Sequence, residues 1–403
     1  MIDTIPMPLG APGGGSATRP FGFSGALPER HPLAIEFGGS GSEYFRIWSV
    51  NLLLTLITFG LYYPWAKVRR LRYFYANTSV GGHPLDFHGD PRRMLRGYLL
   101  VSLMVALYSV AGKVSPLAGL IAFVLVAAVW PALLRAALQF RLANTSWRGL
   151  RFRFDGDLRG VYLAMLPLFV PGALSLLGVL SGAAAPRAAA AMSGLSMLVV
   201  LGLMPLFLWR LKKYQHDHYV FGQIRTELRT GAGPFYLLGL KTIGVALLAG
   251  LAVGTLTMVV GGFAALGAAF GVRSGAPSAA AIFGFILLFL IAYGAVILIV
   301  YPYVTAAMQN LVWGRTGGRL IEFESALGFR ALLGLTLKNW LLVLLTLGLY
   351  LPFAKVATTR LRLESLRVQT LLSPDELEST LRERADDAAG DAAGDLFGLD
   401  IGL

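Results

Sequence analysis

The chain has 403 residues, of which 56% are hydrophobic and only 14% are charged. Soluble proteins carry about 25% charged residues, so this composition excludes an ordinary soluble enzyme. The formal net charge of +13 would suit either nucleic acid or an anionic membrane surface. The long apolar segments decide for the membrane, so we expect membrane lipids, anionic ones in particular, and no nucleic acid as partners.

The two ends differ in composition from the middle of the chain. Residues 1–32 are rich in Gly, Pro and Ser, which predicts a disordered cytoplasmic N-terminal tail. Residues 371–403 form an Ala- and Gly-rich acidic tail, in which we expect a short helix that fades into disorder. A repeat-containing membrane domain is therefore predicted for residues 33–370.

Six long apolar runs in this domain can each cross the membrane as a helix. Such a helix rises about 1.5 Å per residue and needs to span about 30 Å of hydrocarbon. The runs come in pairs that are joined by short turns, so they predict three transmembrane hairpins. They occupy residues 94–112, 116–134, 161–183, 188–209, 235–271 and 279–304.

The distribution of Lys and Arg predicts the orientation of these hairpins. The three hairpin turns hold one cation each, Lys113, Arg187 and Arg273, and nearly all of the other 32 lie between the hairpins or near the two ends. Segments rich in Lys and Arg face the cytoplasm. We therefore expect both termini on the cytoplasmic side of a bacterial inner (plasma) membrane.

A nearly repeated sequence lies at the two ends of the domain. Residues 51–68 read NLLLTLITFGLYYPWAKV and residues 339–356 read NWLLVLLTLGLYLPFAKV, with 12 of 18 positions identical. Chance does not produce such identity at this separation, so the sequence indicates an internal repeat.

The two copies are too short for ordinary spans, because only 16 residues separate Lys338 from Lys355. A single crossing by each copy would also place Lys355 outside, against the charge rule. Both copies break at T-x-G-x-Y-x-P, where Gly and Pro interrupt a helix. The sequence favours two re-entrant half-spans, near residues 47–66 and 339–354, over two ordinary spans.

Short alternating segments follow the helices and predict strands. They read LAIEFGG, HPLDFHG, LRFRFDG, IRTELRTG and RLIEFES, and Thr lies fourteen residues after three helix-ending prolines, at Thr78, Thr145 and Thr316. Isolated hairpins are marginally stable, so we expect several to pair. The predicted fold is a mainly α membrane protein: a polytopic helical bundle of repeated transmembrane hairpins with short cytoplasmic β-hairpins.

Three motifs give the chain a family resemblance. They are F-x-G-x-x-x-E-Y-F at Phe37–Phe45, N-x6-T-x-G-x-Y-x-P-W-A-K at Asn51–Lys67, and the second copy at Asn339–Lys355. With these motifs the chain resembles the YjgN-like family of bacterial inner-membrane proteins over roughly residues 33–370. The resemblance implies a polytopic inner-membrane protein of unassigned biochemical role, and it supplies no catalytic residues.

The two broken helices are the first candidate site. Paired helix breaks at equivalent positions of a repeat protein expose N–H and C=O groups that can coordinate a substrate. The architectural alternative is that Gly and Pro make the turn while the polar residues cap or join helices. The candidate substrate-binding residues are Asn51, Thr58, Gly60, Tyr62, Asn339, Thr346, Gly348 and Tyr350.

Basic helical segments with interleaved aromatic residues are the second candidate site. Each cation near an anionic leaflet contributes about 1 kcal/mol to membrane attraction. Generic adhesion to the surface is the expected role, with a dedicated lipid or anion pocket as the alternative. The candidate headgroup contacts are Lys67, Arg69, Arg70, Arg72, Arg210, Lys212, Lys213, Lys355, Arg360 and Arg362.

Histidines on the predicted cytoplasmic side could in principle bind a metal, but Asp217 and His218 occupy the place of the turn-forming pairs Asn77-Thr78 and Asn144-Thr145. We therefore expect structural histidines, no metal site and no cofactor. No nucleophile–base pair or phosphate loop is present, so an enzyme is not expected. No predicted span contains Asp or Glu, which disfavours proton coupling.

Three functional hypotheses follow. A facilitative transporter or channel-like protein for a small anionic or amphipathic solute or lipid would have a polar cavity between the two T-x-G-x-Y-x-P elements. A non-transporting lipid-binding or membrane scaffold protein would have a tightly packed interior. A membrane enzyme would require the histidines to meet in one site. The sequence favours the first only slightly, and the oligomeric state is not predicted.

Overall fold

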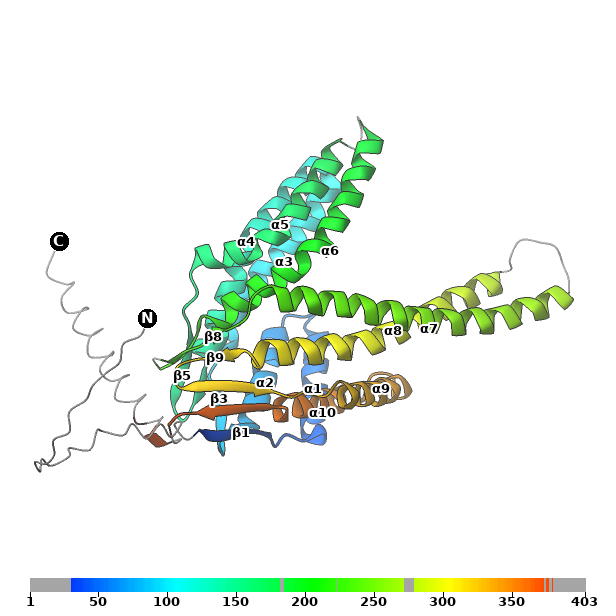
Figure 1. Cartoon of the computed structure of the whole chain (residues 1–403). Helices are drawn as coiled ribbons and strands as arrows, with labels where there is room; N and C mark the ends of the chain where they lie inside the picture. Colours follow the sequence, from blue (N-terminus) through cyan, green and yellow to red (C-terminus); the bar gives the residue numbers. More distant parts are fainter. Residues whose placement is uncertain are drawn as a thin grey trace, which may run out of the picture.

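Helical hairpins that extend from a layer of strands make up the computed structural model of the chain (Figure 1). The structure describes residues 30–181, 185–222, 224–271, 279–372, 375, 376 and 379. The predicted N-terminal tail, except for its last three residues, lies outside these described residues, as does most of the acidic tail.

Three pairs of long helices confirm the predicted membrane-length runs. Within the described residues, six helices are long and apolar enough to cross a membrane. Many of their large apolar side chains are exposed, as expected for surfaces that face lipid. The helices are α3 (Pro91–Val114), α4 (Pro116–Ala143), α5 (Leu158–Ser181), α6 (Pro186–His216), α7 (Gly233–Gly271) and α8 (Ala279–Trp313).

Each copy of the duplicated sequence forms a shorter helical hairpin. The first consists of α1 (Gly41–Ile57) and α2 (Tyr63–Ala76), and the second of α9 (Phe329–Leu345) and α10 (Leu351–Glu364). The turns use a left-handed backbone conformation at Gly60 (φ 88°) and Gly348 (φ 94°), which favours glycine. In each hairpin the second helix packs back along the first.

Eleven strands of the described chain pair antiparallel into one sheet, in the order β7-β6-β5-β4-β3-β2-β1-β11-β10-β9-β8. All five predicted strand segments are present, and they join one sheet instead of standing as separate hairpins. The strands are β1 (His31–Phe37), β2 (Thr78–Val80), β3 (His83–Phe87), β4 (Thr145–Trp147), β5 (Leu150–Phe154), β6 (Tyr219–Phe221), β7 (Ile224–Arg225), β8 (Glu227–Leu228), β9 (Thr316–Gly317), β10 (Ile321–Ser325) and β11 (Leu366–Thr370).

Every helical hairpin begins and ends on two strands that pair with each other. The strand pairs are β1–β2, β3–β4, β5–β6, β8–β9 and β10–β11, and each encloses one hairpin. The described chain is thus five successive β–α–α–β units. Because paired strands lie side by side, both ends of a hairpin meet the same sheet.

The five units share one spacing. In each, the second strand begins fourteen residues after a helix proline: Pro64, Pro131, Pro205, Pro302 or Pro352.

The predicted threonines open three of these strands. Thr78, Thr145 and Thr316 are buried, and each hydroxyl donates a hydrogen bond of 2.7–2.8 Å to the backbone carbonyl four residues earlier. The predicted correspondence of Asp217 and His218 with the Asn-Thr pairs is wrong by one residue. His218 takes the asparagine position, because its Nδ1 lies 2.7 Å from the Tyr214 carbonyl, four residues earlier.

The units follow one another around a ring that closes between the first and last strands. Strand β1 pairs with β11, with Leu33 opposite Val368 and Ala34 opposite Arg367. Each helix contacts the next helix along the chain, and α10 contacts α1. The two ends of the strand order, β7 and β8, are separated in the chain by Thr226 alone.

A single apolar core lies inside the curved sheet. Buried residues from β1, β4, β6, β7 and β11 form one cluster, although these strands are spread across the strand order. Trp147 fills part of it and donates from Nε1 to the Val80 carbonyl at 3.1 Å. The sheet therefore curls around its own core, whereas the buried helix residues form separate clusters between neighbouring elements.

Candidate anion-binding site

The helix after each proline presents one face to the interior of the ring. Positions three, seven and ten residues after a proline share one side of an α-helix. In α10 these positions are Lys355, Thr359 and Arg362, and all three line one cavity. In α8, Gln309 lies seven residues after Pro302 and lines the same cavity.

This cavity has a volume of about 870 Å³ and lies between the two short hairpins and α8. The transporter hypothesis expected a polar cavity between the two T-x-G-x-Y-x-P elements, but this cavity borders only the second element, through Leu351 and Pro352. Asn339 and Thr336 contribute polar groups, and Trp48, Tyr301 and Trp340 contribute aromatic surface. The lining contains three cations, Arg70, Lys355 and Arg362, and no carboxylate.

These three cations belong to a larger cationic cluster from four helices. Arg70 is close enough for its charge to act on both Lys67 and Lys355. Arg141 acts on Lys67 and on Lys212, and Arg362 also acts on Lys212. The cationic cluster consists of Lys67 and Arg70 on α2, Arg141 on α4, Lys212 on α6, and Lys355 and Arg362 on α10.

The cluster has no compensating negative charge in the part of the chain that the structure describes. No ion pair within 4.0 Å involves any of its six members there. Arg362 instead donates from Nε to Gln309 Oε1 at 2.8 Å. Like charges that share an interior repel one another, so the arrangement favours the entry of an anion.

This repulsion contributes to a lowered pKa of two lysines outside the long helices. Burial lowers the pKa of Lys67, and the charges of Arg70 and Arg141 lower it further. Burial also lowers the pKa of Lys355, again with a contribution from Arg70. A bound anion would act in the opposite direction, because it stabilises the protonated amines.

The other predicted headgroup contacts lie outside the cationic cluster, and most of them bond to backbone carbonyls or to a carboxylate of the protein. Arg72 donates to the Gly89 carbonyl at 3.2 Å and Arg210 donates to the Leu163 carbonyl at 3.1 Å. Arg360 joins α10 to the end of β1 through the Phe37 and Gly39 carbonyls. Lys213 pairs with Asp217 at 2.8 Å, whereas Arg69 is exposed.

Arg141 is a member of the cluster that our sequence analysis did not select. It lies ten residues after Pro131, as Arg362 lies ten residues after Pro352. The shared offset of ten residues from the proline could have identified Arg141. It was missed because Arg141 is a single arginine at the end of an apolar run and lies outside the basic stretches.

The hydroxyl groups of the duplicated threonines form hydrogen bonds with backbone groups at the helix break. Thr58 Oγ1 donates to the Leu54 carbonyl at 2.8 Å and accepts from the Tyr62 amide at 2.9 Å. Thr346 repeats both bonds, with Leu342 at 2.7 Å and Tyr350 at 3.0 Å. Each hydroxyl replaces a backbone partner that is lost where the helix stops. This geometry supports the architectural alternative for these residues.

The duplicated asparagines are buried between the two helices of each hairpin. Asn51 Nδ2 lies 3.5 Å from the Ala66 carbonyl, and Asn339 Nδ2 lies 3.4 Å from the Ala354 carbonyl. Both Oδ1 atoms are buried without a partner in the described structure. The asparagines therefore link the helices, and only Asn339 also borders the cavity.

The duplicated tyrosines stack on neighbouring rings at the helix starts. The ring of Tyr62 lies 6.0 Å from that of Trp65, and the ring of Tyr350 lies 5.4 Å from that of Phe353. Gly60 and Gly348 provide the turn itself. Of the predicted substrate-binding residues, only Asn339 lies in the cavity wall.

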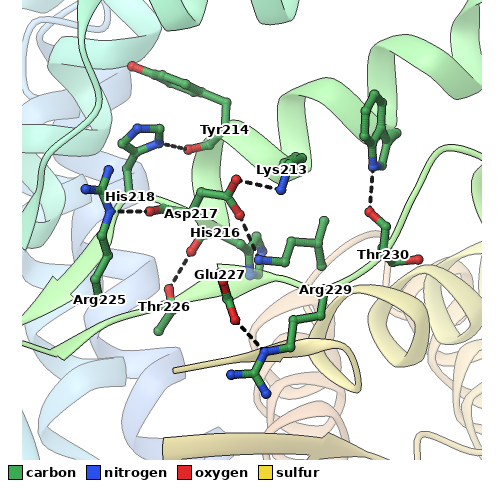
Figure 2. A network of polar contacts seen from close by, with 12 residues as sticks. Lys213, Tyr214, His216, Asp217, His218, Arg225, Thr226, Glu227, Arg229 and Thr230 are labelled. Atoms are coloured by element: carbon green, nitrogen blue, oxygen red, sulfur yellow. Dashed lines mark hydrogen bonds and ion pairs between the residues drawn. The ribbon is translucent and has the colours of Figure 1, made fainter. Parts of the chain in front are cut away.

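Three of the histidines, His88, His216 and His218, have local hydrogen-bond partners. Figure 2 shows His218 bonded to the Tyr214 carbonyl and Asp217 engaged by Lys213, beside the break between β7 and β8. Asp217 Oδ1 also accepts the Leu228 amide at 2.7 Å. His216 bonds to Thr316 and His88 to Ser146. Among the described residues, no three potential metal-binding side chains form a group.

Comparison with known proteins decides the family. Residues 32–396 match the model of a bacterial protein family of unknown function, DUF898. The chain belongs to this family. It is a polytopic membrane protein by its six membrane-length helices, and no solved structure matches it significantly.

Two of the similar proteins are both named inner membrane protein YjgN. The one from Salmonella typhimurium is 32% identical over 149 residues, which cover 36% of this chain and 38% of the relative. The one from Escherichia coli K12 is 32% identical over 127 residues, or 31% of this chain and 32% of the relative. The matches thus span well under half of each relative, and they confirm the resemblance to YjgN-like proteins.

The hydroxyl at the helix break gives a direct test of its structural role. Replacing Thr58 by Val removes one acceptor and one donor, and we expect about 1–2 kcal/mol lower stability of the hairpin. Thr58→Ser keeps the hydroxyl and serves as the control. Thermal unfolding in detergent micelles measures the difference. An unfolding temperature of Thr58→Val equal to that of Thr58→Ser would contradict the assignment.

Proposed function

We propose that this protein is a facilitative transporter of the bacterial inner membrane for a small anionic or amphipathic solute or lipid. The observation that carries the proposal is the cavity between the duplicated hairpins, in which Arg70, Lys355 and Arg362 face a lining without carboxylates. The inner-membrane location is inferred from the relatives named YjgN.

Charge and surface chemistry both support an anionic amphiphile. Taking six cations partly out of water costs free energy unless an opposite charge joins them, and a bound anion supplies that charge. The aromatic rings of Trp48, Tyr301 and Trp340 provide an apolar wall beside the cations. A volume of about 870 Å³ is in the range of ligand pockets.

A second function is favoured by another observation. The tips of the short hairpins carry very exposed apolar side chains, with Phe59 97% and Leu347 93% exposed. Both residues also have positive φ, which is unfavourable for bulky side chains. These tips suit an apolar surrounding and could anchor a non-transporting lipid-binding or scaffold protein. An anionic lipid headgroup would also fit the cationic cavity in this alternative, so flux across the bilayer is what separates the two functions.

We further propose that the two short hairpins are re-entrant and that the sheet is cytoplasmic. Both ends of each hairpin lie on paired strands, so a hairpin that enters the lipid returns to the side it left. The cations between the predicted spans lie on the sheet side, which the positive-inside rule places in the cytoplasm. Both termini then lie in the cytoplasm, and the five similar β–α–α–β units are copies of one repeat.

Single cysteines test this topology, because the chain has none of its own. We expect Lys113→Cys, in the turn between α3 and α4, to react with a membrane-impermeant maleimide added to intact spheroplasts. Arg319→Cys, between β9 and β10, should react only after lysis. Leu347→Cys should resist the reagent from both sides. Labelling of Leu347→Cys from outside would show that the second hairpin crosses the membrane.

Flux into liposomes tests the transport proposal. The protein is reconstituted with two probes, a fluorescent-tail phosphatidylglycerol and radiolabelled inorganic phosphate. Replacing both Arg70 and Lys355 by Gln removes about 2 kcal/mol of attraction, so flux at low probe concentration should fall about thirtyfold. Arg69→Gln is the matched control, since Arg69 is the neighbouring exposed arginine of α2. Wild-type flux no faster than that of empty liposomes for either probe would favour the scaffold.

A further inference from the structure

We propose that the ligand of this site carries at least two phosphate groups and that the cationic cluster binds both of them. This inference rests on the proposed function of the cavity as an anion site. It adds the chemical class of the ligand and assigns a binding role to Lys67, Arg141 and Lys212, which lie beyond the cavity lining.

The amount of positive charge is the first argument. Three cations line the cavity, Lys67 and Lys212 are close enough to interact electrostatically with Arg70 and Arg362, and Arg141 interacts with these two lysines. A single phosphate carries at most two negative charges, so it would leave most of the cluster unbalanced. Two or more phosphates would approach balance, and no carboxylate in the cavity lining competes for the cations.

The depth of the cluster is the second argument. The six cations lie three (Lys67, Lys355), six (Arg70), seven (Lys212) and ten (Arg141, Arg362) residues after the prolines of their helices. Seven residues of helix rise about 10 Å, so the Cα atoms of the cluster are spread over this length and over four helices. A ligand with two phosphates can contact more of these cations at once than a single phosphate can.

The side-chain chemistry is the third argument. Arginines present planar donors that bind phosphate in a bidentate way, whereas lysines act as point charges. The cluster supplies arginine from three different helices, at Arg70, Arg141 and Arg362. Arg362 donates to the neutral amide of Gln309, and the guanidinium groups of Arg70 and Arg141 make no hydrogen bond within the described residues. A carboxylate of the described chain therefore does not compete with phosphate oxygens for these groups.

The shared chemistry can come from a soluble diphosphate or from a lipid with two phosphates. The cations are common to both, and the aromatic wall of the cavity would contact only the lipid chains. The experiment therefore compares one-phosphate and two-phosphate members of each class. The soluble probes are inorganic phosphate and inorganic pyrophosphate, and the lipid probes are phosphatidylglycerol and cardiolipin.

The full chain in neutral maltoside micelles is titrated with the four probes by calorimetry and by native mass spectrometry. In at least one class, we expect the two-phosphate probe to bind at least tenfold more tightly than the one-phosphate probe. The variant Arg141→Gln with Lys212→Gln should lose that preference and keep its one-phosphate affinity within about threefold. Arg92→Gln with Arg93→Gln removes two exposed charges at the start of α3 and should change neither affinity.

The outcomes separate this inference from the function on which it rests. Equal affinities in both classes, or a preference that survives in the double variant, would overturn the two-phosphate inference and leave the anion site intact. No binding of any probe to the wild type would overturn both. If the double variant does not fold, Lys212→Gln alone should still reduce the preference, and an undiminished preference there contradicts the proposal.

Discussion

The pairing of neighbouring antiparallel strands is the constraint on which the rest of this structure depends. Each helical hairpin leaves one strand and returns to the strand beside it, so every hairpin is tied at both ends to the same sheet. The pairing of β1 with β11 then brings the first and last units together. Without that pairing, the duplicated hairpins would have no common cavity.

This constraint also explains why charges that are far apart in the sequence meet. The proline spacing fixes how far each helix runs before its strand begins, and so it gives the helices a common rotation with respect to the sheet. The same face of α2, α4, α6 and α10 then turns inward. Cations on that face repel one another, which lowers stability, and such a cost is typical of binding sites.

Much of the architecture could be predicted from the sequence. The long apolar runs identify the six helices, because hydrophobic length is a local property. The alternating segments identify strands, and the T-x-G-x-Y-x-P motif identifies the two breaks for the same reason. The closure of the ring could not be predicted, since β1 and β11 are more than 300 residues apart and their register has no local signal.

The site was predicted only in part, and the errors have physical causes. Lys67, Lys212, Lys355 and their arginine neighbours were recognised as basic, but the sequence does not tell which cations face the interior and which cap carbonyl groups, as Arg72 and Arg360 do. Thr58 and Thr346 were predicted to bind substrate because they are polar residues at a helix break. The break itself uses their hydrogen-bonding capacity.

The most direct test of a shared interior is the effect of one arginine on two lysines from different hairpins. Amine-reactive labelling requires neutral lysine, and Arg70 helps to lower the pKa of both Lys67 and Lys355. Mass spectrometry of the pulse-labelled protein near pH 9 should therefore show slower labelling of both lysines in Arg70→Gln than in the wild type or Arg69→Gln. If Lys67 slows while Lys355 keeps its wild-type rate, the two hairpins do not share one interior and the account fails.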